Sequence, residues 1–253
     1  MPWDLLPLLP LGILAGLLSG LLGIGGGLIF SPLLLFLGLS PHQALATSTL
    51  AILPTTMAGS WAHLRSGQVP RPAILAISGG AISGALLFSH AGGGLKGWQL
   101  LALQGLMYGV LALVIAPRPA DADGSQPPPL PRLGLAGVGL VAGWSSGLLG
   151  VGGGLVMVPL MVQGLGIRVY QAIRLSTLAV CASAAAASVT FWHDGRGNLS
   201  MGLLLGGTAA LASQWSASRL QSVSEQRLVG LLRLLCALLA LDAGRRAVQL
   251  LLT

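Results

Sequence analysis

The chain has 253 residues, of which 54% are hydrophobic and only 8% are charged. This composition excludes a water-soluble globular protein and predicts an integral membrane protein. The formal net charge of +7 comes from arginines near the ends of apolar segments, a pattern typical of membrane anchoring beside anionic lipid and not of nucleic-acid binding.

The first apolar stretch contains the phrase GLLGIGGGL at residues 20–28, and the arm after the glycines, residues 28–39, has only 12 residues. At about 1.5 Å per residue, this arm reaches about 18 Å as a helix, well short of a hydrocarbon core about 30 Å thick. Two arrangements fit this length. The arm either belongs to a hairpin of half-helices that returns to the same membrane face, or to one long, tilted and unwound crossing. The hairpin is the simpler arrangement, and we predict it.

Three longer apolar runs follow, at residues 43–62, 72–89 and 98–116. Each comes close to the about 20 residues that a helical crossing needs, and none alternates as a strand would. These runs therefore predict membrane-spanning helices and not a barrel. The next segment, PRPADADGSQPPPLPR at residues 117–132, is rich in proline and predicts an extended linker.

The second half of the chain repeats the first. The phrase GLLGVGGGL at residues 147–155 lies 127 positions after its counterpart, and the arm at residues 155–166 is equally short. Further apolar runs follow at residues 170–192, 199–217 and 228–252. The pattern predicts one all-α integral membrane domain made of two homologous repeats, residues 1–116 and 133–253. Each repeat is a glycine-interrupted half-helix hairpin plus three transmembrane helices.

The hairpin also decides how the repeats are oriented. A returning hairpin plus three crossings leaves the chain on the opposite face, so we predict inverted repeats whose glycine turns meet near the midplane. One long crossing would instead give parallel repeats, whose turns need not face each other. Basic residues do not choose between these arrangements, since both place seven on one face and four on the other. In the hairpin arrangement the cytoplasmic face carries Arg65, Arg71, Arg118, Arg132, Arg168, Arg219 and Arg227.

Three consecutive glycines at each turn suit the binding of an anion. Glycine adopts positive φ without steric cost and leaves its N–H uncovered, and the helix that follows has a partial positive charge at its N-terminus. The candidate donors are Gly23, Gly25, Gly26, Gly27, Gly150, Gly152, Gly153 and Gly154. Close helix packing is the alternative for these residues, and it is the interpretation we prefer for Gly12, Gly16, Gly20, Gly139 and Gly143.

Hydroxyls and basic side chains near the turns are secondary candidates. The hydroxyls either donate to an anion or bond to carbonyls of their own helices, and they belong to Thr47, Ser48, Thr49, Ser176 and Thr177. Arg174 stands where the first repeat has Ala46, and it either faces a cavity or extends to the interface. His63 and His193 end equivalent spans, where they either cap the interface or take part in gating.

The sequence contains no cluster that predicts catalysis, a metal site or a cofactor. Cys181 and Cys236 lie in apolar runs without metal-ligand spacing. The six acidic residues lie in termini, loops or near segment ends, so we do not expect a carboxylate proton relay through the membrane. Two alternatives to a transporter stay open. One is an anion channel, and the other is a membrane-embedded enzyme or scaffold that works with a partner protein through His63, His193 and Asp194.

The chain resembles the sulfite exporter TauE/SafE family of membrane permeases. The resemblance covers nearly the whole chain and rests on both GLLGxGGGL phrases, on Pro32 and Pro159 just after them, and on the segments ATSTLAI and HLRSGQV. It implies an exporter of small sulfur-containing anions, such as sulfite or organosulfonates, in the bacterial inner membrane. Its partners would be the anion and the lipid bilayer, and transport would use alternating access at a midplane site. The second repeat departs from the family pattern at Arg174-Leu175, where small residues are expected.

Overall fold

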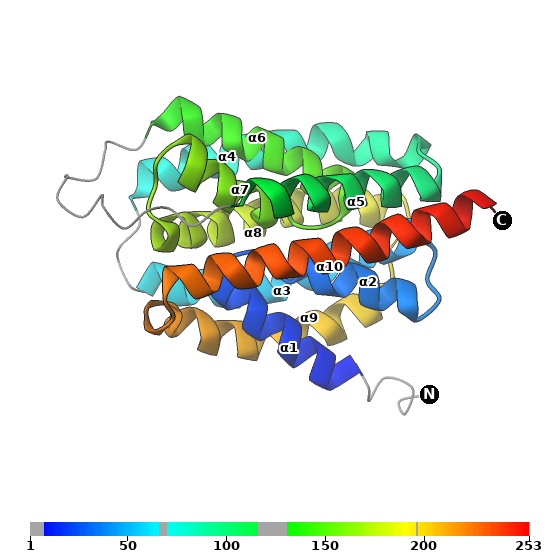
Figure 1. Ribbon diagram of the computed structural model, residues 1–253, viewed down its shortest axis with the longest axis horizontal. Helices are drawn as coiled ribbons and strands as arrows, with labels where there is room; N and C mark the ends of the chain where they lie inside the picture. The colour runs from blue at the N-terminus through cyan, green and yellow to red at the C-terminus, as the bar shows by residue number, and fades with distance from the viewer. Residues whose placement is uncertain (1–7, 66–69, 116–130, 196, 253) are drawn as a thin grey trace.

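The computed structural model describes residues 8–65, 70–115, 131–195 and 197–252, and these residues form helices and no strand (Figure 1). The first half contains α1 (Leu8–Leu22), α2 (Gly27–Phe36), α3 (Pro41–Arg65), α4 (Arg71–Ala91) and α5 (Gly97–Val114). The second half contains α6 (Arg132–Leu149), α7 (Gly154–Pro159), α8 (Val169–His193), α9 (Leu199–Ser218) and α10 (Glu225–Leu252). Short turns of other helix types follow α4, α7 and α9, namely η2 (Gly92–Gly94), η4 (Leu160–Gly164) and η5 (Leu220–Ser222).

The six apolar runs predicted to cross the membrane coincide with the long helices α3, α4, α5, α8, α9 and α10. Among the described residues, four segments are long and apolar enough to cross a membrane: Arg71–Gly94, Gly97–Val114, Arg132–Leu149 and Val169–His193. The third of these is α6, which has 18 residues and leads into the second glycine turn. The prediction of a half-helix is therefore wrong for this arm, because it was based only on the short arm that follows the glycines.

Each glycine turn reverses the direction of the chain. α2 begins beside Ile52 in the middle of α3 and ends close to the start of α3 at Pro41, so these two helices are antiparallel. In Figure 1, α1 points inward from the side of the N-terminus and α2 returns to that side. α7 and η4 likewise return to the side from which α6 starts (Figure 1). The two short arms thus run back along the bundle and do not extend the helices before them.

The two halves pack against each other reciprocally. α4 of the first half lies along α6 of the second, and α9 of the second half lies along α1 of the first. Glycines permit both contacts, because a Cβ atom at Gly143 would meet the backbone of Ala81, and one at Gly16 would meet the backbone of Ala209. The prediction that these glycines serve helix packing is confirmed. α3 and α8 also contact each other, and α5 pairs with α10.

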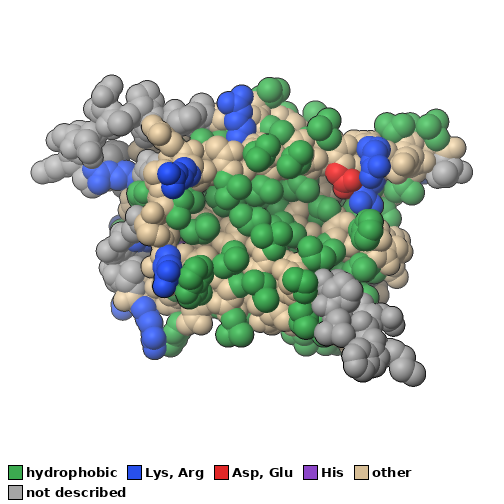
Figure 2. Space-filling model, turned by 60° about the horizontal axis from the view of Figure 1, so that its bottom comes forward, with side chains coloured by type: hydrophobic (Ala, Val, Ile, Leu, Met, Phe, Trp, Pro, Cys, Tyr) green, Lys and Arg blue, Asp and Glu red, His purple; other side chains and the backbone are tan. Residues whose placement is uncertain are grey.

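The surface has the pattern of a protein surrounded by lipid. Hydrophobic side chains cover the middle of the face shown in Figure 2, and lysine and arginine side chains gather at its two ends. Leu75, Leu113 and Leu211 are exposed to 74%, 80% and 75%, and a hydrocarbon environment is the one in which such side chains are stable. The predicted linker at residues 117–132 lies outside the described residues except for its last two positions.

Candidate functional site

The two glycine turns have the same backbone conformation. The φ angles are 68°, 78° and 81° at Gly23, Gly25 and Gly26, and 62°, 86° and 71° at Gly150, Gly152 and Gly153. Residues with a side chain rarely adopt this left-handed region, so the turns require glycine at these positions. Gly27 and Gly154 then begin α2 and α7.

The turns lie in direct contact with each other. A Cβ atom at Gly27 would lie 2.5 Å from the carbonyl oxygen of Val151 in the second turn. In the equivalent contact, a Cβ atom at Gly154 would meet the carbonyl oxygen of Gly23 in the first turn. Both turns are buried. The fold therefore brings the two predicted groups of glycines together in the interior of the bundle.

Among the residues that the structure describes, several backbone N–H groups at both turns have no hydrogen-bond acceptor. The first hydrogen bonds of α2 run from Ile29 and Phe30 to the carbonyl of Gly26, at 2.9 and 3.1 Å, and α7 begins in the same way. Within the part of the chain that the structure describes, the N–H groups of residues 25–28 and 152–155 donate no hydrogen bond. A buried donor without a partner costs about 1–3 kcal/mol. The positive ends of two helices add to this, so a negatively charged acceptor would be stabilised here.

Two serines connect each repeat to the turn of the other. The Ser48 hydroxyl donates to the carbonyl of Gly150 at 3.2 Å, and the Ser176 hydroxyl donates to the carbonyl of Gly23 at 2.9 Å. A second carbonyl lies within 3.4 Å of each oxygen, and both serines are fully buried. In this conformation the two hydroxyls hold the turns in place.

The neighbouring threonines have other partners. Thr49 and Thr177 each donate to the carbonyl four residues earlier in their own helix, at 2.9 Å. The Thr47 oxygen accepts the backbone N–H of Asn198 at 2.9 Å, which ties α3 to the start of α9. Of the two interpretations that the sequence left open, bonding to carbonyls of their own helices describes Thr49 and Thr177, and Ser176 in part. Ser48 bonds instead to carbonyls of the two glycine turns. Their contact with an anion stays a prediction.

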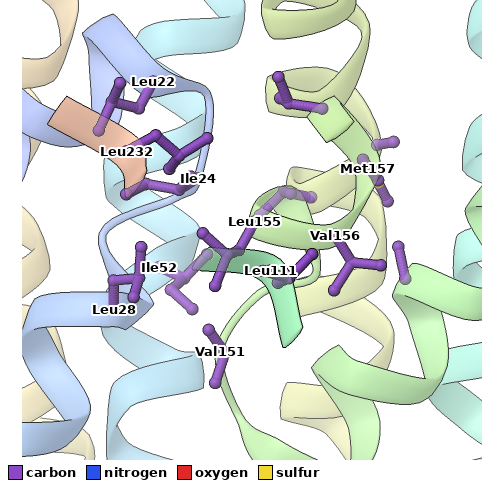
Figure 3. Packing of buried hydrophobic residues seen from close by; sticks show 14 of the residues in the cluster. Leu22, Ile24, Leu28, Ile52, Leu111, Val151, Leu155, Val156, Met157 and Leu232 are labelled. Carbon is purple, nitrogen blue, oxygen red and sulfur yellow. The ribbon is translucent and has the colours of Figure 1, made fainter. Parts of the chain in front are cut away.

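Two branched aliphatic side chains pack against both turns. Ile52 of α3 and Val180 of α8 occupy equivalent positions in the repeats, and a Cβ atom at Gly152 would lie 3.0 and 3.1 Å from them. Figure 3 shows Ile52 among hydrophobic side chains from both halves, near Leu28 and Val151. We expected space for an anion between the turns, but in this conformation the turns touch and aliphatic side chains pack over them.

Comparison with known proteins identifies the family. The model of the sulfite exporter TauE/SafE family matches residues 8–243. The chain belongs to the sulfite exporter TauE/SafE family. It is similar to a "Probable membrane transporter protein" of Xylella fastidiosa (strain 9a5c), with 34% identity over 175 residues, 67% of each chain. It is also similar to "Probable membrane transporter protein YunE" of Bacillus subtilis (strain 168), with 23% identity over 257 residues, 92% of this chain and 94% of the relative.

No solved structure matches the chain significantly. Membership of the TauE/SafE family and the four candidate spans nevertheless make this chain a multi-pass membrane transporter. The conclusion agrees with the exposed apolar surface between two charged ends (Figure 2).

The basic side chains that the sequence suggests as site residues of this TauE/SafE protein have different environments in the two repeats. His63 is only 2% exposed and lies close enough to Arg174 for an electrostatic interaction, so the structure brings two candidates together. Its counterpart His193 is exposed, with its Nδ1 4.0 Å from a carboxylate oxygen of Asp194. The two histidines thus differ in exposure, and interface capping or gating stays a prediction for each of them. Among the described residues, no group of three or more histidine, cysteine, aspartate or glutamate side chains could hold a metal ion.

Ser19 and Ser146 are site candidates that the sequence analysis missed. They are 1% and 0% exposed, and within the described residues neither hydroxyl has a hydrogen-bond partner. Their own carbonyls accept the N–H groups of Gly23 and Gly150 at 2.8 and 3.1 Å, so each serine lies one helical turn before its glycine turn. A signal was available, because the two serines match at the same 127-residue offset as the glycines.

Proposed function

We propose that this protein exports small sulfur-containing anions, such as sulfite or organosulfonates, across the bacterial inner membrane by alternating access. The family name and the names of the relatives, which are probable membrane transporters, support this proposal. The observation that carries it is the pair of touching glycine turns, whose buried N–H groups have no acceptor within the described residues.

An oxyanion would satisfy this set of donors. Its several oxygens accept N–H groups from both turns, and hydrogen bonds to a charged acceptor are about twice as strong as neutral ones. The hydroxyls of Ser19 and Ser146 add two donors, and Arg174 adds a positive charge from α8. Ser48 and Ser176 would position the turns and contact the anion only when their bonds to the carbonyls open.

We infer that the two halves are inverted repeats. α1 runs parallel to α9, and α6 runs parallel to α4, as the order of their glycine contacts indicates. α3 and α8 are antiparallel, because Ser60 near the end of α3 donates to Thr177 near the start of α8. In such an arrangement the N-termini of α2 and α7 approach the same volume from opposite directions, which concentrates positive potential there.

We assign the structure to a closed state of the transport cycle. The turns touch and Ile52 and Val180 pack against them, so an anion reaches the donors only when one hairpin moves away from α3 and α8. Movement of the first hairpin would open the site to one face of the membrane, and movement of the second would open it to the other. Two equivalent hairpins around one site thus provide alternating access.

Export needs no coupled proton in this scheme. Among the described residues the acidic ones are Asp194 after α8, Glu225 at the start of α10 and Asp242 in its middle third. None of these acidic residues belongs to the segments that form the glycine turns. An interior-negative potential favours outward movement of an anion by about 2.3 kcal/mol per charge per 100 mV.

Counterflow tests the proposal. Purified protein in liposomes loaded with unlabelled sulfite should accumulate labelled external sulfite, and a panel of oxyanions and organosulfonates should compete in a saturable way. Absence of exchange with every anion would favour an enzyme or scaffold. Ionic currents too large for a cycle of alternating access would favour a channel. Either result would overturn the proposal.

A further inference from the structure

A cleft of about 450 Å³ lies between the C-terminal ends of α3 and α9, away from the glycine turns. Its walls combine aromatic, apolar and polar side chains: Trp61, Ala62, Arg65, Leu211, Gln214, Trp215 and Ser218. The two helices are parallel here, since Gly202 contacts Leu50 and Gly206 contacts Pro54. Their last turns therefore reach the same end of the bundle.

Both tryptophans that line the cleft carry a stacked arginine four residues later in the chain. The guanidinium of Arg65 lies 4.9 Å from the ring centre of Trp61, and that of Arg219 lies 4.4 Å from the ring centre of Trp215. Both arginines are exposed, and within the described residues neither forms a salt bridge. Two positive charges thus lie on the tryptophans that line the cleft, and within these parts of the chain neither has a salt-bridge partner.

The rest of the cleft suits a hydrocarbon chain. Trp61 and Trp215 are each 54% exposed, and Leu211 and Met57, toward the middle of the same helices, are 75% and 61% exposed. Aromatic rings with a cation at the outer end and aliphatic side chains at the inner end match the boundary between the head groups and the hydrocarbon of a bilayer. A small free anion would gain nothing from these apolar walls.

We propose that this cleft binds an anionic phospholipid, whose phosphate pairs with the two arginines and whose acyl chain covers the two tryptophan faces. Basic pockets between membrane helices are suited to anionic head groups, and exposed arginines match a phosphate with two parallel hydrogen bonds. The site is separate from the glycine turns, so the proposal stands or falls independently of the transported substrate.

The test counts bound lipid and needs no transport. Purified protein is titrated with phosphatidylglycerol or phosphatidylcholine in detergent, and lipid adducts are quantified by native mass spectrometry. The test variant is Arg65→Gln with Arg219→Gln. The matched control is Arg71→Gln with Arg132→Gln, which removes the same charge from exposed residues at the start of two other helices, α4 and α6. Gel filtration confirms that both variants remain monodisperse.

We expect the wild type to retain phosphatidylglycerol in preference to phosphatidylcholine, and the test variant to bind it about tenfold more weakly. The control variant should bind as the wild type does, and millimolar inorganic phosphate should not displace the lipid. Three results would overturn the proposal. They are equal binding of the two lipids, an equal loss in the control, and displacement by inorganic phosphate, which would mark a site for a free anion.

Discussion

The two repeats agree closely at their glycine turns and differ around them. Both turns have positive φ at the same three positions, and each receives a hydrogen bond from a serine of the other repeat. Ile52 and Val180 pack over the turns from equivalent positions. The two turns are therefore alike in backbone conformation, in hydrogen bonding and in side-chain packing. We attribute this likeness to a site that both repeats build together.

The surroundings of the turns are not symmetrical. α2 is a regular helix of 10 residues, whereas α7 ends after 6 and continues as the π-type turn η4. Ser31 of α2 accepts a hydrogen bond from Gln104, which also donates to Tyr108, while the position that matches Ser31 holds Val158. The first hairpin is thus tied to α5 by a buried polar network, so the two hairpins should differ in how readily they move.

The largest expected effect on transport comes from placing a side chain at a glycine of either turn. Gly26→Val and Gly153→Val each place a β-branched residue at positive φ, where it is strongly disfavoured. We expect each change to abolish sulfite counterflow while the protein still folds. Gly207→Val is the matched control, because this glycine is exposed on α9 and a Cβ there meets nothing within 4 Å. Normal flux in one of the two turn variants would show that the two turns do not contribute equally to transport.

Shortening the aliphatic side chains that cover the turns should have the next largest effect, on both stability and the choice of anion. Ile52→Ala should lower the free energy of unfolding by about 2–5 kcal/mol, and Val180→Ala by less, since fewer buried groups are lost. Both changes leave space beside the turns. We expect the flux of a bulky organosulfonate to rise several-fold relative to that of sulfite, measured as a ratio in the same liposomes.

Ile77→Ala serves as the control for these two variants. Ile77 is fully buried in α4 and packs on α6, so its loss costs comparable packing energy at a distance from the turns. An equal change of the flux ratio in this control would mean that loss of packing in general, and not the covering of the turns, sets the preference for small anions.

Alanine substitutions in two pairs of serines should have opposite effects on the stability of the protein. Ser48→Ala and Ser176→Ala each remove a hydrogen bond to a turn, so we expect each to cost about 0.5–1 kcal/mol of stability. Ser19→Ala and Ser146→Ala remove buried hydroxyls that have no partner among the described residues. These changes should leave thermal stability equal or higher but raise the half-saturating sulfite concentration, by about threefold to tenfold if one hydrogen bond is lost.

Thermal unfolding in detergent and counterflow kinetics separate the two pairs. If Ser19→Ala and Ser146→Ala leave the half-saturating concentration unchanged, these hydroxyls do not contact the anion. A large loss of stability for only one member of the Ser48 and Ser176 pair would show that the two turns are not held in the same way.

Much of this arrangement could be predicted from the sequence. The duplicated phrases located both turns, and the lengths of the apolar runs located six long helices to within a few residues. The glycine triplets predicted positive φ, which the first two glycines of each triplet adopt, whereas Gly27 and Gly154 begin the following helices and lie against the opposite turn. These features follow from the backbone conformations that glycine allows and from the lengths of apolar runs, and both can be read from a single sequence.

Other features depend on how the helices rotate against each other. Ser48 and Thr49 are neighbours in the chain, yet only Ser48 reaches the opposite turn, because successive residues differ by about 100° around a helix. The same dependence buries His63 and exposes His193. Counted from Ile52 and Val180, His193 lies two residues further along its helix than His63 does, a rotation of about 200° around the helix. The packing of Ile52 and Val180 against both turns likewise requires the contact between repeats, which no pattern within one repeat contains.

The central claim is that backbone N–H groups at the turns bind the anion, and replacing a backbone amide by an ester tests it directly. Leu28 or Leu155 is exchanged for its α-hydroxy analogue, which deletes one N–H and keeps the side chain, and Leu34 within α2 is exchanged as a control. We expect the half-saturating sulfite concentration to rise about tenfold or more for the first two, since a hydrogen bond to a charged group contributes about 1.5–3 kcal/mol. The Leu34 ester should leave it unchanged. Unchanged values for both Leu28 and Leu155 would contradict the claim.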